Sequence, residues 1–162
     1  MTKPTLYFAA PLFSQAELAF NQSIAERLEA FFAVYLPQRD GGLFAKMVEA
    51  GILPNAASGR IFALDLAAIN RSDVLLIILD GRAVDEGAAF ELGYAHAIGK
   101  VCIGLQTDPR RLLPFGNNPM ITGPLITIFV SVDALLSWAS SFATIVANEQ
   151  NQRYTNDAGS KL

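Results

Sequence analysis

Short apolar segments alternate along the chain with longer stretches in which apolar residues recur at helical spacing. Five apolar segments are expected to form strands, at residues 5–10, 33–36, 74–79, 101–105 and 125–130. The run VLLIIL at residues 74–79 is unbroken, which is typical of a central parallel strand covered on both faces. Between these segments, the spacing predicts helices over residues 15–31, 59–70, 87–98 and 132–146.

An alternation of strands and helices favours a parallel sheet with helices on both of its faces. The sequence therefore predicts a single-domain α/β protein with a flavodoxin-like, doubly wound, five-stranded parallel sheet in the order 2-1-3-4-5. We expect the domain to cover residues 1–147, and residues 148–162 to form a polar, flexible C-terminal tail.

The expected fold also indicates where a ligand would bind. Sheets of this kind bind ligands at the carboxyl ends of their strands, near the point where the strand order reverses. This rule selects the loops that follow Ala9, Pro37, Leu79 and Leu105. Residues 38–58 are Gly-rich and could contain a short helix around residues 44–49, and the length of the segment predicts a binding loop or a lid.

Composition narrows the classes of partner. Hydrophobic residues make up 52% of the 162 residues and charged residues 17%, so large surfaces should be hidden by helices, by subunit contacts, or by both. A net charge of −3 without a basic cluster argues against nucleic acid or an anionic membrane as a partner. The one cysteine, Cys102, lies in an apolar run and is expected to be a buried thiol, and with a single histidine it argues against a metal site.

The location of the protein is predicted from the same features and from the termini. Without a disulfide framework, an intracellular location is expected, and no apolar run approaches the roughly 20 residues that span a bilayer. The first residues lack the features of a signal peptide, whereas the C-terminal Ser160-Lys161-Leu162 matches a peroxisomal address. We expect a cytoplasmic protein in a bacterium, and a protein of a peroxisome-like organelle (a glycosome) in a eukaryote.

The residues that could carry chemistry are acidic. Neither a GxGxxG fingerprint nor a P-loop occurs, and there is no GxSxG nucleophile motif. Asp85 and Glu91 flank the start of the helix after the central strand, and Asp65 lies on the preceding helix. When the pKa values of two carboxyl groups in one cleft differ, one group can act as an ionised nucleophile and the other as a protonated acid. A Glu near a helix N-terminus is favoured in the ionised form, which is the form that a nucleophile needs.

Simpler interpretations exist for the same residues. An acidic residue near a helix N-terminus is usually a cap or a solvated group, and spacing alone favours that interpretation for Asp85 and Glu91. Asp73 is expected to serve a turn where the central strand begins. Taken alone, Tyr7 is expected in the core and His96 on a packing or surface position.

Four segments, in this order, resemble the nucleoside 2-deoxyribosyltransferases: YFAAPLF from Tyr7, Asp65-Leu66, DEGAAFELGYA from Asp85, and Asn118-Pro119-Met120. The resemblance extends over residues 7–142. Its most specific part is the block D-x5-E-L-G-Y-A, in which Glu91 follows Asp85 by six residues.

The resemblance implies a retaining ping-pong exchange of the nucleobase of a 2'-deoxyribonucleoside. Glu91 matches the nucleophile that attacks C1' and forms a covalent deoxyribosyl-enzyme, which a second base then resolves. Asp65 matches the carboxyl group that protonates the leaving base, and Tyr7 matches the tyrosine that orients the nucleophile. Asp85 matches a carboxylate beside the sugar hydroxyls.

The resemblance also implies how the protein assembles and what it binds. Asn118 and Met120 match residues that a neighbouring subunit lends to the site, so a homo-oligomer is expected, either a dimer or a hexamer. Gln38, Arg39 and Asp40 fall in the segment that contacts the base in the family. The implied substrates are a deoxyribonucleoside and a free base, with purines expected, and no cofactor or metal. The family's C-terminal aromatic carboxylate has no equivalent in this chain.

Three other functions compete with this one. A 2'-deoxynucleoside 5'-monophosphate N-glycosidase of the same superfamily typically carries a small hydroxyl residue where Asp85 stands, and an Asp there would repel a phosphate. A non-catalytic nucleotide-binding or signalling module could use the same fold. A flavin-binding flavodoxin is disfavoured because residues 11–15 lack a run of hydroxyl and amide side chains suited to phosphate.

Overall fold

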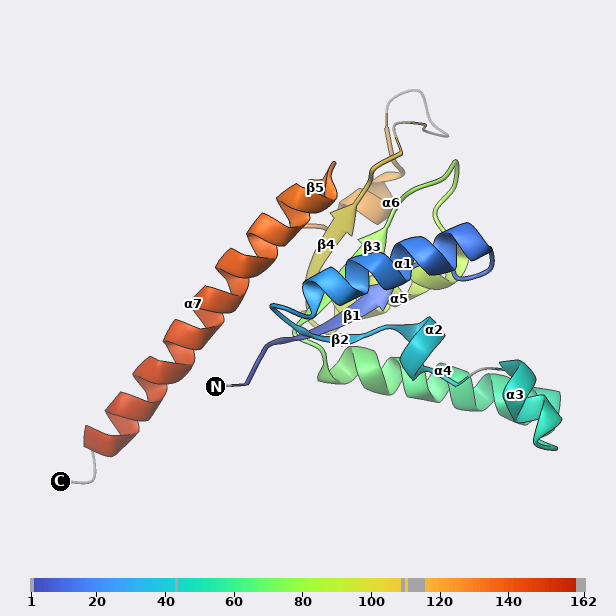
Figure 1. The fold of residues 1–162 in the computed structure, drawn as a ribbon, viewed down its shortest axis with the longest axis horizontal. Helices are drawn as coiled ribbons and strands as arrows, with labels where there is room; N and C mark the ends of the chain where they lie inside the picture. Colours follow the sequence, from blue (N-terminus) through green and yellow to red (C-terminus); the bar gives the residue numbers. More distant parts are fainter. Residues whose placement is uncertain (1, 43, 109, 111–115, 160–162) are drawn as a thin grey trace.

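The computed structural model describes residues 2–42, 44–108, 110 and 116–159. Five parallel strands form one sheet in the order β2-β1-β3-β4-β5, which confirms the predicted topology (Figure 1). The strands are β1 (Thr5–Ala9), β2 (Ala33–Tyr35), β3 (Val74–Ile78), β4 (Val101–Leu105) and β5 (Thr127–Phe129). Each predicted strand is present, with ends that differ by two residues at most.

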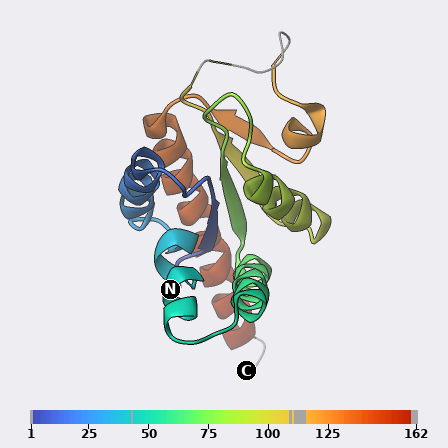
Figure 2. The same cartoon turned by 90° about the vertical axis from the view of Figure 1, so that its right-hand side faces the viewer.

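Long helices cover both faces of the sheet (Figure 2). They are α1 (Gln15–Leu28), α4 (Pro54–Arg71), α5 (Glu86–Ala97) and α7 (Val132–Gly159). Successive residues of a strand point to opposite faces. Leu6 and Phe8 therefore pack with α1 and α7, whereas Tyr7 and Ala9 pack with α4 and α5. Tyr7 consequently lies on the same face as the helices that carry the acidic residues.

The central strand and the cysteine are buried as predicted. All five residues of β3 are at most 2% exposed, because helices cover the strand on both faces. The side chain of Cys102 in β4 is part of the core, and burial raises the pKa of its thiol to about 11.

Local signals set the ends of two helices. Ser14 caps α1 in a capping box: its side chain accepts a hydrogen bond from the backbone N–H of Glu17, and the Glu17 carboxylate accepts one from the Ser14 N–H at 2.7 Å. α5 ends before Gly99, whose φ of +77° is readily adopted only by glycine. Both boundaries follow from the residue types at these positions.

Residues 38–58 do not form one long loop, and the short helix expected around residues 44–49 is present. They contain parts of α2 (Pro37–Asp40), all of α3 (Phe44–Glu49), and the first turn of α4, which begins at Pro54 instead of residue 59. Proline fits the first turn of a helix because its missing N–H would have no partner there. The short α6 (Pro119–Thr122) begins with a proline in the same way.

The last helix is longer than expected. α7 continues through residues 148–159, which the polar composition had assigned to a flexible tail, and it extends beyond the sheet (Figure 1). A polar sequence is compatible with a helix that is surrounded by solvent. Ser160-Lys161-Leu162 lies outside the described residues. Within the described part of the chain, no helix has the length and apolar character needed to cross a membrane.

Candidate active site

Tyr7 and Glu91 meet on the face of the sheet that α4 and α5 cover. Tyr7 lies in the middle of β1 and is fully buried, and its hydroxyl donates a hydrogen bond to Oε1 of Glu91 at 2.6 Å. The cap of α5 is Asp85, whose Oδ2 accepts from the backbone N–H of Ala88 at 2.9 Å. The capping interpretation therefore holds for Asp85, whereas Glu91 turns toward the sheet.

A second tyrosine holds a second carboxyl group. Tyr35, the last residue of β2, is the register partner of Tyr7, and the two rings stack with centroids 5.5 Å apart and 17° between their planes. The Tyr35 hydroxyl donates a hydrogen bond to Oδ1 of Asp65 on α4 at 3.2 Å. Two neighbouring strands thus provide two stacked tyrosines, each bonded to one carboxyl group.

A cavity of about 340 Å³ lies between α3, α4 and α5 beside these groups. Asp65 and Glu91 both line it, and most of the remaining wall is apolar. Phe62 and Phe90, about half exposed, contact each other at its edge with ring centroids 5.9 Å apart. A largely apolar cavity with a few convergent polar groups is the usual form of a small-molecule site.

Burial controls the protonation of this site. It raises the pKa of Glu91 to about 8; the hydrogen bond from Tyr7 lowers that pKa, and the negative charges of Asp65 and Asp85 raise it. Burial therefore opposes the ionised form of Glu91 that its helix position was expected to favour. The pKa of Asp65 is likewise raised by burial, and the bond from Tyr35 opposes that shift.

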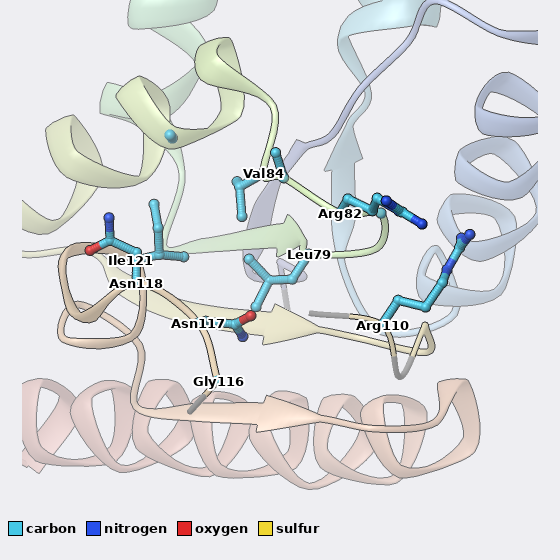
Figure 3. Close-up of a pocket in the computed structure, with 11 residues that line it drawn as sticks. Leu79, Arg82, Val84, Arg110, Gly116, Asn117, Asn118 and Ile121 are labelled. Carbon is cyan, nitrogen blue, oxygen red and sulfur yellow. The ribbon is translucent and has the colours of Figure 1, made fainter. Parts of the chain in front are cut away.

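A second cavity, of about 290 Å³, lies beside the β3–α5 loop and α6 (Figure 3). Ala89 lines this cavity. Because successive residues of an α-helix are rotated by about 100°, Ala89 points away from the side of α5 that carries Glu91. Asn118 lines this cavity and caps α6 by accepting from the N–H of Met120 at 2.9 Å, and Met120 is 80% exposed. Within one chain, Asn118 is therefore not part of the cavity that contains Glu91.

Comparison with known proteins identifies the family. A sequence profile described as nucleoside 2-deoxyribosyltransferase matches residues 6–157, which is nearly the whole chain. The chain belongs to the nucleoside 2-deoxyribosyltransferase family. No curated protein sequence matches it.

Solved structures share the fold of this chain. A crystal structure of a conserved protein from Enterococcus faecalis V583 is 26% identical, with a TM-score of 0.69 over 86% of this chain and 99% of its own. A 2-deoxyribosyltransferase from the psychrotolerant bacterium Bacillus psychrosaccharolyticus is 21% identical, with a TM-score of 0.63 over 82% of this chain and 90% of its own. The second likeness supports the fold of a nucleoside 2-deoxyribosyltransferase.

Two other residues implied by the deoxyribosyltransferase resemblance have structural partners outside the cavity. The Gln38 amide donates to the Leu18 carbonyl at 2.9 Å and accepts from Asn21 at 3.1 Å. Asp40 accepts from the N–H of Leu36 at 2.8 Å and pairs with the neighbouring Arg39. Both side chains hold the segment after β2 in place, and neither lines the cavity beside Glu91.

Of two further sequence interpretations, the surface position of His96 is confirmed, whereas Asp73 links two strands of this deoxyribosyltransferase-family fold instead of serving a turn. Asp73 Oδ2 accepts from both the N–H and the hydroxyl of Thr5 at 2.8 Å, so it joins the starting ends of β1 and β3. His96 lies in the last turn of α5 and is exposed. Among the residues that the structure describes, no three His, Cys, Asp or Glu side chains are grouped as metal ligands.

The sequence interpretation missed part of this candidate site. Tyr35, Phe62 and Phe90 were not singled out, because each looks like an ordinary core residue in its segment. For Tyr35 the only available signal was its place in the strand beside the Tyr7 strand, and sequence alone does not define the register that pairs the two rings.

Proposed function

We propose that this protein is a nucleoside 2-deoxyribosyltransferase that exchanges the nucleobase of 2'-deoxyribonucleosides, with purines as donors and acceptors. One observation carries the proposal: the 2.6 Å hydrogen bond that holds Glu91 against Tyr7 beside a cavity that Asp65 also lines. A buried carboxyl group with an oriented oxygen is the arrangement that a carboxylate nucleophile requires.

In the first half of the reaction, ionised Glu91 attacks C1' of the bound nucleoside. The C1'–N bond breaks, its electron pair goes to the base, and Asp65 transfers its proton to the leaving nitrogen. The product is a free base and a deoxyribosyl ester of Glu91. The Tyr7 hydroxyl donates to one carboxyl oxygen, which leaves the other oxygen of Glu91 to form the bond to carbon.

In the second half, a nitrogen of another base attacks C1' and displaces Glu91. Asp65, now ionised, accepts the proton that this nitrogen loses. Two inversions at C1' give net retention, as in retaining glycosidases, with a base in place of water. One proton shared between the two carboxyl groups is sufficient for the whole cycle, with Glu91 ionised and Asp65 protonated in the productive state.

The cavity wall supports binding of a flat base. Phe44, Phe62 and Phe90 line the cavity with Glu91 and would stack on a purine. Gln38 would reach the base only after releasing Asn21 and the Leu18 carbonyl. Asp85, whose charge acts on Glu91, would accept from a sugar hydroxyl.

The exposed residues of α6 support an oligomer with shared sites. Met120 is 80% exposed, and Asn118 lines a cavity on the opposite side of α5 from Glu91. We propose that these two residues complete the site of a neighbouring subunit in a homo-oligomer. The nucleoside would then lie between Glu91 of one chain and α6 of the next.

Incubation with 2'-deoxyadenosine and hypoxanthine tests the proposal. The expected products are 2'-deoxyinosine and adenine, and mass spectrometry of the protein with 2'-deoxyadenosine alone should detect a deoxyribosyl adduct on Glu91. Glu91→Ala should lose both the exchange and the adduct. An actively exchanging protein without an adduct would contradict the covalent mechanism.

Two alternative functions give different results in the same assay. A 2'-deoxynucleoside 5'-monophosphate N-glycosidase would release base from the monophosphate and would not transfer the sugar to hypoxanthine; the carboxylate of Asp85 disfavours it, because a phosphate would meet a like charge. If the protein is a non-catalytic nucleotide-binding module, the wild type and Glu91→Ala would bind nucleoside with the same affinity, and neither would exchange bases.

A further inference from the structure

We propose that Tyr35 is a positioning residue for the acid of this reaction: it fixes the orientation of Asp65 and assigns the transferable proton to Oδ2. This inference rests on the proposed function, and it concerns a residue outside the group matched to the family. It follows from how two adjacent strands present the two carboxyl groups.

The stacked tyrosines form a rigid platform for both carboxyl groups. Tyr7 and Tyr35 are register partners in a parallel pair of strands, so their side chains leave the sheet on the same face. Their rings are 5.5 Å apart and 17° from parallel. From this platform the Tyr7 hydroxyl bonds to Glu91 at 2.6 Å and the Tyr35 hydroxyl bonds to Asp65 at 3.2 Å. The nucleophile and the acid are therefore oriented by equivalent groups on the same platform.

The hydrogen bond from Tyr35 distinguishes the two oxygens of Asp65. Oδ1 accepts the hydrogen of the Tyr35 hydroxyl, and a proton bound to Oδ1 would compete with that hydrogen for the same side of the oxygen. The proton of the carboxyl group therefore belongs on Oδ2. During departure of the base, this proton moves from Oδ2 to the base nitrogen. The charge that then develops on Asp65 strengthens the bond from Tyr35, because hydrogen bonds to ionised acceptors are the stronger ones.

Tyr35 keeps its own proton throughout the cycle. Burial and the neighbouring Asp65 raise the pKa of the Tyr35 hydroxyl to about 12. Tyr35 therefore acts through Asp65 and neither donates to nor accepts a proton from the substrate. In the first half of the reaction, its loss should impair only those donors whose base must be protonated in order to leave.

Two nucleoside substrates that donate deoxyribose distinguish the positioning role of Tyr35 from a general structural role. The base of 2'-deoxyadenosine leaves as a neutral molecule only if it gains a proton, whereas the cationic base of 7-methyl-2'-deoxyguanosine leaves without one. Tyr35→Phe retains the stacked ring and removes only the hydroxyl. At fixed pH and without an acceptor base, the single-turnover rate of base release should fall about 10-fold for 2'-deoxyadenosine and stay within about 2-fold of the wild type for the methylated donor.

Matched variants make the comparison specific. Tyr94→Phe removes a hydroxyl that bonds to Asn70 at 3.0 Å, away from the cavity, and should leave both donors unaffected. Tyr7→Phe acts on the nucleophile and should slow both donors. In an Asp65→Asn background, adding Tyr35→Phe should cause no further loss with 2'-deoxyadenosine, because the proton that Tyr35 positions is already absent.

The outcomes distinguish the inference from the function on which it rests. Equal losses with the two donors, no loss with either, or an additional loss in the Asp65→Asn background would overturn the role of Tyr35 and leave the transferase proposal standing. A wild-type protein that transfers deoxyribose from neither donor would overturn both proposals together.

Discussion

The Tyr7 hydroxyl donates to Oε1 of Glu91 at 2.6 Å, although 84 positions separate the two residues in the chain. Tyr7 belongs to β1 and is fully buried, whereas Glu91 belongs to α5. The packing of this helix on the sheet therefore sets the orientation of the carboxyl group. In the proposed reaction, the same contact would hold Oε1, so the other carboxyl oxygen of Glu91 would attack C1'.

Replacing Tyr7 with Phe tests this orienting contact. The buried ring and its stacking on Tyr35 are retained, and only the bond to Glu91 is lost. A hydrogen bond to a charged group is worth about 1.5–3 kcal/mol, so kcat for base exchange should fall about 10- to 100-fold. Steady-state kinetics with saturating 2'-deoxyadenosine and hypoxanthine would measure the effect.

Tyr94→Phe provides the control for Tyr7→Phe. It also removes one tyrosine hydroxyl, but that hydroxyl bonds to Asn70 between α4 and α5. Its kcat should stay within about 2-fold of the wild type, as expected for a contact away from the reacting atoms. Equal losses in the two variants would mean that Tyr7 contributes only to packing.

The pKa of Glu91 predicts a pH-dependent difference in stability between the wild type and Glu91→Gln. Folding raises this pKa from about 4.5 to about 8, so the folded protein binds the proton more tightly than the unfolded chain. The stabilisation from the protonated group is complete below about pH 4.5 and is lost as the pH rises to about 8. Because Gln does not titrate, the variant should gain stability relative to the wild type over this range.

Urea unfolding at several pH values measures this difference. On going from pH 5 to pH 8.5, the unfolding free energy of Glu91→Gln relative to the wild type should increase by on the order of 2 kcal/mol, after allowing for the solvent that reaches the carboxyl group. The Gln side chain still offers an oxygen to Tyr7. A constant difference across the pH range would contradict the raised pKa.

Asp85 is predicted to select a nucleoside over a nucleotide. In Asp85→Ser, the new hydroxyl can still cap α5, so stability should change by less than about 1 kcal/mol. The negative charge beside the sugar is removed, and a 5'-phosphate no longer meets a like charge. Affinity for 2'-deoxyadenosine 5'-monophosphate, measured by calorimetry, should increase about 10-fold, while exchange from 2'-deoxyadenosine decreases.

The comparison between Asp85→Ser and Asp85→Asn sharpens that test. Both side chains can cap the helix and neither is charged, so both should gain nucleotide affinity if charge is the cause. A gain in nucleotide affinity in Asp85→Ser alone would indicate that the size of the side chain, and not its charge, determines this affinity. A gain in neither would remove the argument that Asp85 disfavours the monophosphate N-glycosidase.

The order of the strands could be predicted because the apolar segments are short and mostly separated by stretches with helical spacing, an alternation that is typical of a doubly wound parallel sheet. The ends of α4 and α7 could not, since Pro54 was read as part of a loop and the polar residues after 147 as a tail. Helix propensity and polarity are properties of a segment by itself, whereas the position of a helix end also depends on the surrounding structure and solvent. Solvent around α7 is sufficient to accept its polar side chains.

The site was predictable only in part for a related physical reason. Asp65, Asp85 and Glu91 were identified as candidates from their residue type and from the resemblance. The ionised form of Glu91 was expected from its helix position alone, whereas burial has the largest effect on its pKa and raises it. Tyr35 was missed because its role arises from the β1–β2 register, which no local pattern in the sequence specifies.

Shared active sites predict that two inactive variants regain activity when they are mixed. Glu91→Ala removes the proposed nucleophile, and Asn118→Ser removes the amide while retaining a side chain that can cap α6. If α6 of one subunit completes the site of its neighbour, a mixed dimer contains one site with wild-type Glu91 from one chain and wild-type Asn118 from the other.

Unfolding the two variants together and refolding them at a 1:1 ratio should restore about a quarter of the wild-type activity per chain, because about half of the dimers are mixed and each has one complete site. Each variant refolded alone should stay below about a tenth, and the wild type refolded alone gives the reference value. Activity in the mixture that equals the mean of the separate samples would mean that Asn118 acts within its own chain or not at all. Size-exclusion chromatography of the same samples would confirm that mixing occurred in an oligomer, and a monomeric profile with full wild-type activity would contradict the shared site directly.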